Sequence, residues 1–138
     1  MSIYAEDIDK AIAFLSCLYR FEEDGPFVQT VLAMTKEEVL IYNDNAPDKQ
    51  EGADWSYKVK IRFPLQFIEL ATNEVIESRR KINVKTNRLT LNVKEGEEKK
   101  VYDFFYYDDS RSYAYNIIAG LKKFSVKAKN IKTNLHTN

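Results

Sequence analysis

Between residues 27 and 127 the chain reads as seven short β-like runs followed by one amphipathic helix, and this order restricts the fold more than any other feature. The runs alternate apolar with polar side chains or are rich in β-branched and aromatic residues, as strands are. The predicted strands span 27–34, 37–43, 55–63, 65–70, 79–85, 88–94 and 99–107, and the predicted helix spans 110–127. We therefore expect a mainly β (α+β) fold, a small antiparallel barrel that the last helix caps. A chain of 138 residues holds one such core and is too short for two ordinary domains.

The first residues predict an extra helix in front of the barrel. Ile8, Ile12, Leu15 and Tyr19 recur at helical spacing, so a helix is expected over 5–21. The glycine and proline that follow would end it. The predicted division of the chain is an N-terminal helix over 1–25 that packs on the barrel or on another subunit, the barrel with its C-terminal helix over 26–127, and a basic tail over 128–138.

The middle of the chain predicts one clear hairpin. Strands 79–85 and 88–94 alternate in period two, and the turn between them is expected at Thr86 and Asn87. The segment from Ala71 to Ser78 reads as a weak turn. Residues 43–54 are polar and acidic and read as a loop, because they carry no large apolar side chain for a core.

Two stretches resemble a known family. Phe63-Pro64-Leu65-Gln66-Phe67-Ile68-Glu69 is similar to the region around the fourth strand of bacterial pleckstrin-homology-like (PH-like) and GRAM-like domains. The run from Arg88-Leu89-Thr90-Leu91 through Gly96 to Phe104-Phe105 resembles the strand pair before their final helix. With the element order, the resemblance covers about 100 residues.

The resemblance to the pleckstrin-homology superfold implies a split barrel of two nearly orthogonal antiparallel sheets, four strands and then three, closed at one end by the last helix. Lipid-binding members place several Lys and Arg in the loop between their first two strands. The corresponding loop here is Thr35-Lys36-Glu37-Glu38, which argues against phosphoinositide recognition.

Strand alternation also predicts a basic outer face. If the apolar side chains of the middle strands point inward, the intervening cations point outward and form an attractive surface for phosphates. The candidate anion-binding residues are Lys58, Lys60, Arg62, Arg79, Lys81, Lys85, Arg88 and Lys94. The alternative, which we favour, is that strand lysines keep the sheet soluble and discourage edge pairing.

The last predicted strand is apolar on both faces. Tyr102, Phe104 and Tyr106 alternate with a second set, Val101, Phe105 and Tyr107. One set must fill the barrel, and the other needs a cover, which is either the N-terminal helix or a partner protein or second copy. We favour cover from within the chain, since an aromatic stripe is more often core than recognition surface. Asp103 within this strand marks a wet edge or bonds a tyrosine hydroxyl.

The residues that most enzymes need are scarce. The single histidine, His136, lies close to the C-terminal end, so we expect neither a Ser-His or Cys-His site nor a metal site, and no cofactor is predicted. Asp108 and Asp109 are better explained as helix-capping residues than as a catalytic pair. A hydrolase built from carboxylates alone is the low-ranked alternative. The single cysteine, Cys17, excludes an internal disulfide.

These observations predict a non-enzymatic, cytoplasmic protein-binding or scaffolding module from an AT-rich bacterial genome, whose partner is either another protein or a second copy of the chain. The alternative is peripheral binding of an anionic ligand, a lipid headgroup or nucleic acid. Lys plus Arg and Asp plus Glu both number 21, so only local patches would attract such a ligand. No apolar run approaches the length of a membrane span, and no secretion signal is recognised at the start.

Overall fold

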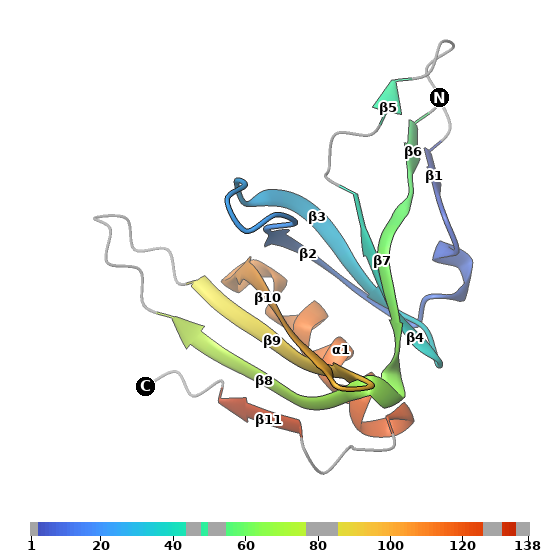
Figure 1. Ribbon diagram of the computed structural model, residues 1–138. Coiled ribbons are helices and arrows are strands. Elements are labelled where there is room, and N and C mark those ends of the chain that lie inside the picture. The colour runs from blue at the N-terminus through green and yellow to red at the C-terminus, as the bar shows by residue number, and fades with distance from the viewer. Residues whose placement is uncertain (1–2, 44–47, 50–54, 77–85, 126–130, 135–138) are drawn as a thin grey trace.

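The computed structural model describes residues 3–43, 48–49, 55–76, 86–125 and 131–134, and they form a split β-barrel with one α-helix (Figure 1). The barrel strands are β2 (Ala13–Tyr19), β3 (Val28–Met34), β4 (Glu38–Tyr42), β7 (Val59–Pro64), β8 (Ile68–Ile76), β9 (Thr86–Glu95) and β10 (Glu98–Tyr107). The helix α1 spans Arg111–Phe124.

One eight-stranded sheet runs in the order β11-β8-β9-β10-β2-β3-β4-β7, in which β11 (Ile131–Asn134) is parallel to β8 and every other neighbouring pair is antiparallel. The chain turns from β7 into β8 through a short 3-10 turn, η2 (Leu65–Phe67). Between β10 and β2 the register has a single Cα pair, Phe105 opposite Leu18. The sheet therefore bends into two halves, β2-β3-β4-β7 and β8-β9-β10, that meet along this seam.

The core lies between the two halves and is closed by α1. Leu15 and Leu32 come from the first half, and Leu91 and Phe104 from the second, and each is at most 1% exposed. Helix α1 packs mainly against β2, and Ile117 and Leu121 on its apolar face are almost fully buried. The capped antiparallel barrel predicted from the order of elements is confirmed.

The predicted N-terminal helix is wrong. The same residues form a short strand β1 (Ile3–Ala5), a 3-10 turn η1 (Ile8–Lys10) and the barrel strand β2. In β2 burial alternates strictly: Ala13, Leu15, Cys17 and Tyr19 are buried, whereas Phe14 and Ser16 are exposed. This run is nearly all apolar, so its sequence fits the spacing of a helix as well as the alternation of a strand. The antiparallel pairing of all seven β2 residues with β3 decides in favour of the strand.

The N-terminal residues cover the outer side of the first half-sheet. Ala33, Leu40 and Tyr42 are buried there under a cluster that includes Ala5 and Ala11. The Tyr42 hydroxyl donates to the Glu6 carbonyl at 2.5 Å, and the Val59 N–H donates to Glu6 Oε1 at 2.8 Å. Strand β4 is consequently buried on both faces.

A small second sheet stands beside the start of β7. Strand β6 (Trp55–Tyr57) pairs in parallel with β1 and antiparallel with β5 (Asp48–Lys49). This sheet includes part of the segment predicted as a loop over 43–54. Beside this sheet the Glu6 N–H donates to the Tyr57 carbonyl at 2.9 Å, and the Asn43 N–H donates to the Lys58 carbonyl at 2.9 Å.

The middle of the chain differs from the prediction. Ala71 to Ile76, predicted as a weak turn, continue β8, and Leu65 to Phe67, predicted as strand, form η2. Thr86 and Asn87, predicted as a turn, are the first residues of β9 and pair with Ile76 and Val75. The predicted strand 79–85 lies outside the described residues. In the predicted basic tail, residues 131–134 form β11.

Candidate functional site

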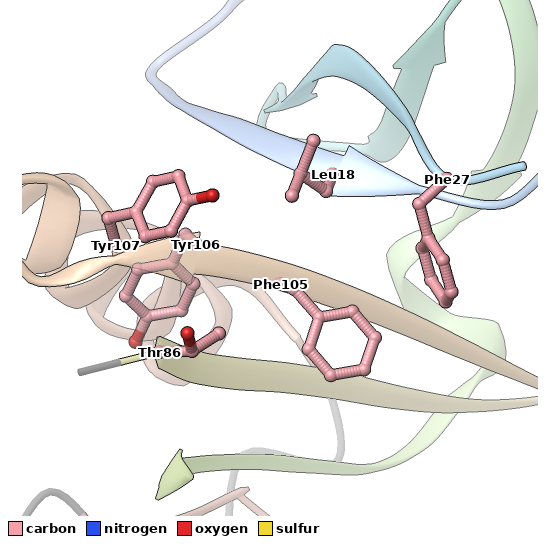
Figure 2. A pocket seen from close by; sticks show the side chains of 6 residues that line it. All are labelled: Leu18, Phe27, Thr86, Phe105, Tyr106 and Tyr107. Carbon is pink, nitrogen blue, oxygen red and sulfur yellow. The ribbon is translucent and has the colours of Figure 1, made fainter. Parts of the chain in front are cut away.

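An aromatic groove lies at the seam between β2 and β10 (Figure 2). Its volume is about 440 Å³. The lining residues are Leu18, Phe27, Thr86, Phe105, Tyr106 and Tyr107. The groove forms because the two strands share one register pair, so their side chains diverge on either side of it.

Alternation along β10 places two of these aromatic residues outside the barrel. Tyr102, Phe104 and Tyr106 point inward and are buried. Val101 is 60% exposed and Tyr107 50% exposed, and Phe105 is partly buried. These are the two alternating sets predicted from the sequence, and the set of Tyr102, Phe104 and Tyr106 is the one that fills the barrel.

Phe27 provides the intramolecular cover for Phe105. Its ring meets the Phe105 ring edge-on with 5.4 Å between the centroids, and it stays 47% exposed. The guanidinium of Arg20 lies over the outer part of the same cluster, 4.9 Å from the Phe27 ring centroid. Figure 2 shows Phe27, the residue before β3, reaching towards Phe105 on β10. Among the described residues, Phe27 supplies the one ring contact of Phe105, and Tyr107 and Val101 stay exposed.

The apolar surface continues along the outer side of β2. Phe14 is 49% exposed and stacks on Tyr113 of α1, with 5.8 Å between the ring centroids. Leu18 lies opposite Phe105 and lines the groove together with Tyr107, and Phe14 lies four residues before Leu18 on the same outer side of β2. We call the resulting surface the aromatic face, and it consists of Phe14, Leu18, Phe27, Phe105, Tyr107 and Tyr113.

A buried polar network supports this face from the inner side. The Tyr106 hydroxyl donates to Asn73 Oδ1 at 2.5 Å, and burial raises the pKa of Tyr106 to about 12. Asn87, directly opposite Tyr106, donates through Nδ2 to Asp108 Oδ1 at 2.8 Å. Tyr106 is thus neutral at physiological pH and fixed in one orientation beneath the groove.

The structure tests the predicted hydrogen bond of Asp103 and the predicted helix-capping role of Asp108 and Asp109. Asp103 accepts a hydrogen bond from its cross-strand neighbour Thr90 at 2.6 Å, rather than from a tyrosine hydroxyl. Asp108 and Asp109 lie in a 3-10 turn, η3 (Asp108–Ser110), and no side chain caps the start of α1, so their predicted capping role is wrong. Asp108 instead binds Asn87.

The structure describes five of the eight predicted anion-binding residues, namely Lys58, Lys60, Arg62, Arg88 and Lys94. Arg79, Lys81 and Lys85 lie outside the described residues. Arg62 binds Asp7 at 2.9 Å and Glu38 at 3.4 Å, and Arg88 binds Glu74. The exposed cations among the five described are Lys58, Lys60, Arg62 and Lys94.

Lys60 and Arg62 line a second cavity of about 370 Å³ together with Lys100. Glu95 and Glu98 line it as well. The cavity separates the open edge of β7 from the β9–β10 hairpin. Its mixed charge makes it a weaker phosphate site than the sequence pattern suggests.

The described residues offer no group of three or more His, Cys, Asp or Glu that could hold a metal ion. His136 lies outside them. Cys17 is buried, and burial raises the pKa of its thiol to about 12. Within the same part of the chain, no helix has both the length and the apolarity needed to cross a bilayer.

Sequence reasoning missed Phe14, Phe27 and Tyr113 as members of the aromatic face. Phe14 lies within the helix expected over 5–21, and Phe27 is the first residue of the strand expected over 27–34. The alternation of Ala13, Leu15, Cys17 and Tyr19 with Phe14, Ser16 and Leu18 was the available signal.

No protein-family model matches the chain, and neither does any curated protein. Among solved structures, the hSac2 domain from human phosphoinositide phosphatase Sac2 is similar, with a TM-score of 0.56 and 13% identity over 94% of this chain and 78% of that one. The N-terminally truncated linker-DH/PH domains of p115-RhoGEF give a TM-score of 0.48 at 13% identity over 83% of this chain and 28% of that one. The DH/PH domains of p115-RhoGEF give 0.46 at 11% identity, over 84% and 30%.

At these identities the likeness concerns the fold alone. The strand order, the split between β7 and β8, and the single helix after the last barrel strand are those of a PH-like split barrel, as predicted. The narrower likeness to bacterial GRAM-like domains stays a prediction.

Proposed function

We propose that this PH-like split barrel is a non-enzymatic, cytoplasmic protein-binding module, that its contact surface is the aromatic face, and that its partner is a second copy of the chain. The observation that carries the proposal is the exposure of the outward-facing side chains of β10. Val101 and Tyr107 are at least half exposed, and the only ring that the described residues place on Phe105 is Phe27.

Exposed aromatic residues gathered on one rigid surface are typical of protein interfaces. Tyrosine and phenylalanine supply large contact area and lose little side-chain entropy on binding. Here they stand on paired strands and on a helix whose other faces are fixed in the core. A surface of this kind is preorganised, so little ordering cost opposes binding.

A second copy is the partner that charge permits most readily. The formal net charge is zero, so two copies do not repel each other at long range. The aromatic face is itself largely uncharged, with Arg20 at one side. Two such faces related by a two-fold axis would bury the same residues on each copy.

Photo-crosslinking tests the surface and the partner together. Purified protein with p-benzoylphenylalanine in place of Tyr107 is expected to give a covalent dimer on irradiation. The same substitution at Ile8, an exposed apolar residue on η1 outside the aromatic face, is the control and should give none.

The outcome separates three cases. A dimer from position 107 alone supports the proposal. A product from position 107 that forms only when other proteins are present keeps the surface and overturns the second copy as partner. Equal products from both positions, or none from position 107 under any condition, would rule out the aromatic face as the contact surface.

Anionic-ligand binding is the second proposal, and one observation favours it. Lys94 and Lys99 lie directly opposite each other on β9 and β10, and both are exposed. Like charges in this position destabilise a strand pair, and a bound anion would relieve the repulsion. The engagement of Arg62 and Arg88 by carboxylates weighs against it.

A further inference from the structure

A cavity of about 370 Å³ lies between β7 and the β9–β10 hairpin. The hairpin side chains that line it belong to the same alternating set as Leu91 and Phe104, which fill the core. The cavity therefore continues the inner side of the barrel beyond the core. The mouth of a β-barrel is a common place for a small-molecule site, and such sites span about 300 to 1,000 Å³. This cavity is at the small end of that range and suits a ligand of low molecular mass.

The buried part of the cavity lining is apolar and rigid. The rings of Phe63 and Tyr102 stack with 5.0 Å between their centroids, and Val93 lies beside them in the lining. Each of the three is at most 8% exposed. Strand pairing holds the two rings, since Phe63 lies opposite Val39 and Tyr102 opposite Leu91. An apolar group that lies on this floor loses its contact with water without any reordering of the protein.

Exposed carboxylates and an ammonium group stand on the hairpin side of the cavity. Glu95 and Glu98 lie directly opposite each other in the strand register, and Lys100 follows Glu98 on the same face. Like charges in this position destabilise a strand pair, and a cation between them removes the repulsion. None of the ion pairs among the described residues involves these three side chains. Their charges are therefore available to a ligand.

The two cations on the β7 side differ in what already holds them. Arg62 pairs with Asp7 and with Glu38, so carboxylates compensate its charge. The Lys60 ammonium lies 5.0 Å from the centroid of the Phe21 ring, and no ion pair among the described residues includes it. Lys60 is therefore the cation of β7 that stays open to an anionic group.

Tyr102 joins the apolar floor to the charged rim. Burial raises the pKa of its hydroxyl, the nearby Lys100 ammonium lowers this pKa, and the Glu95 carboxylate raises it. The hydroxyl thus lies close enough to feel both charges and is neutral at physiological pH. A ligand above Tyr102 meets an apolar surface, a negative side and a positive side at once.

We propose that this cavity binds a free α-amino acid with an apolar side chain. The ammonium group lies between Glu95 and Glu98, the carboxylate faces Lys100, and the side chain covers Phe63 and Tyr102. An anion alone would leave the glutamate pair without a partner, and a cation alone would leave the lysine without one, so a zwitterion uses both charges. The site shares no residue with the aromatic face and does not rest on the function proposed above.

An NMR titration of the full ¹⁵N-labelled chain with L-phenylalanine tests the proposal. The backbone amides of Val93 and Tyr102 are expected to shift saturably, with a Kd of about 1 mM or tighter. Three analogues keep the ring: phenethylamine lacks the carboxylate, 3-phenylpropanoate lacks the ammonium group, and N-acetyl-L-phenylalanine amide lacks both charges. Each should bind at least about tenfold more weakly than L-phenylalanine. Phosphocholine and inorganic phosphate are the probes for a lipid headgroup and for a simple anion.

Two substitutions with matched controls assign the charges. Glu95→Gln with Glu98→Gln should weaken L-phenylalanine binding at least about tenfold, whereas Glu97→Gln, in the turn between them and outside the lining, should leave it unchanged. Lys100→Gln should weaken binding similarly, and Lys99→Gln, on the opposite face of the same strand, should not. All five side chains are exposed, so the variants are expected to fold.

The ligand series on the wild type decides the proposal even if a variant fails to fold. No saturable shift at Val93 and Tyr102 with L-phenylalanine would overturn it. So would equal binding of the analogue that lacks the ammonium group, or tighter binding of phosphocholine or phosphate. In the folded variants, equal affinity of the glutamine pair and of Glu97→Gln would overturn it as well.

Discussion

The ring of Phe27 meets the ring of Phe105 edge-on at 5.4 Å, across the seam where the two halves of the barrel share one register pair. This contact divides the outer side of β10 into a covered position and two open ones, Val101 and Tyr107. Had the expected N-terminal helix lain over this strand, all three would have been buried. Because the first strand lies inside the sheet instead, Val101 and Tyr107 stay exposed.

The two faces of β10 should respond very differently to truncation. Phe104→Ala removes a fully buried ring and is expected to lower the free energy of unfolding by about 3 to 5 kcal/mol. Val101→Ala removes exposed methyl groups and should change it by about 0.5 kcal/mol or less. Urea denaturation followed by circular dichroism measures both. Comparable losses in the two variants would mean that the inward and outward assignments of β10 are wrong.

The ion pair between Asp7 and Arg62 should make the attachment of the N-terminal segment sensitive to acid. The hydrogen bond from Arg62 lowers the pKa of Asp7 below its ordinary value of 3.8. A lowered pKa means that the contribution to stability is fully present above pH 3.8 and is lost as the pH falls through the pKa of the folded state.

Wild type and Asp7→Asn should therefore differ in unfolding free energy at neutral pH and converge below pH 3.8. Denaturation curves at several pH values give this difference, and Asp9→Asn, two residues away on η1, is the control for a lost surface carboxylate. A difference that persists unchanged at low pH would show that the Asp7 carboxylate is not its source.

Gly120 should not tolerate a methyl group, although alanine is the better helix former. A Cβ at this position would lie 2.7 Å from Sδ of Met34, whose side chain is fully buried. Alanine gains about 1 kcal/mol in helix propensity, but forced overpacking costs about 1 to 3 kcal/mol, so a net loss is expected. In a Met34→Ala background the clash is absent, and Gly120→Ala should become stabilising. A double-mutant cycle with no coupling between the two positions would contradict this packing.

Lys94→Glu separates the two functional proposals. It replaces a like-charged cross-strand pair with an opposite-charged one, so stability should rise by about 0.2 to 1 kcal/mol. If the aromatic face is the contact surface, Lys94→Glu should elute from heparin at the same salt concentration as Lys122→Glu, a helix variant of equal net charge. A much earlier elution of Lys94→Glu than of Lys122→Glu would instead favour anion binding at this hairpin.

The sequence predicts the barrel well where strands have one wet face. Leu89, Leu91 and Val93 alternate with polar residues, and the structure buries all three. The alternation of Tyr102, Phe104 and Tyr106 likewise identifies the inward side of β10. In these strands the period-two pattern reports burial directly, because only one face meets the core.

The first strand could not be predicted in the same way. Ala13 to Tyr19 is apolar on both faces, since Phe14 and Leu18 contribute to the aromatic face, and the run fits a helix as well as a strand. The choice is made by β3, which lies next in the chain and pairs with every residue of β2. The alternation within this run does not decide between helix and strand, because both alternating sets are largely apolar, so the outcome depends on the long-range pairing.

The candidate site was predicted only in its central part. Phe105 and Tyr107 follow from alternation along one strand, whereas Phe27 and Tyr113 join them through contacts between distant segments. For the basic residues, the sequence predicts where the cations point but not which carboxylates pair with them. Charge patterning places Arg62 and Arg88 outside the barrel but does not reveal that Asp7 and Glu74 neutralise them.

Light scattering on the wild type and on the double variant Phe105→Ser with Tyr107→Ser tests the central claim most directly. We expect the mass of the wild type to rise towards a dimer with concentration, with little dependence on salt, and the double variant to stay monomeric and folded. Ile8→Ser, which removes an exposed apolar residue elsewhere, should behave like the wild type. A wild type that is monomeric at every concentration, or a double variant that dimerises equally well, would contradict self-association through the aromatic face.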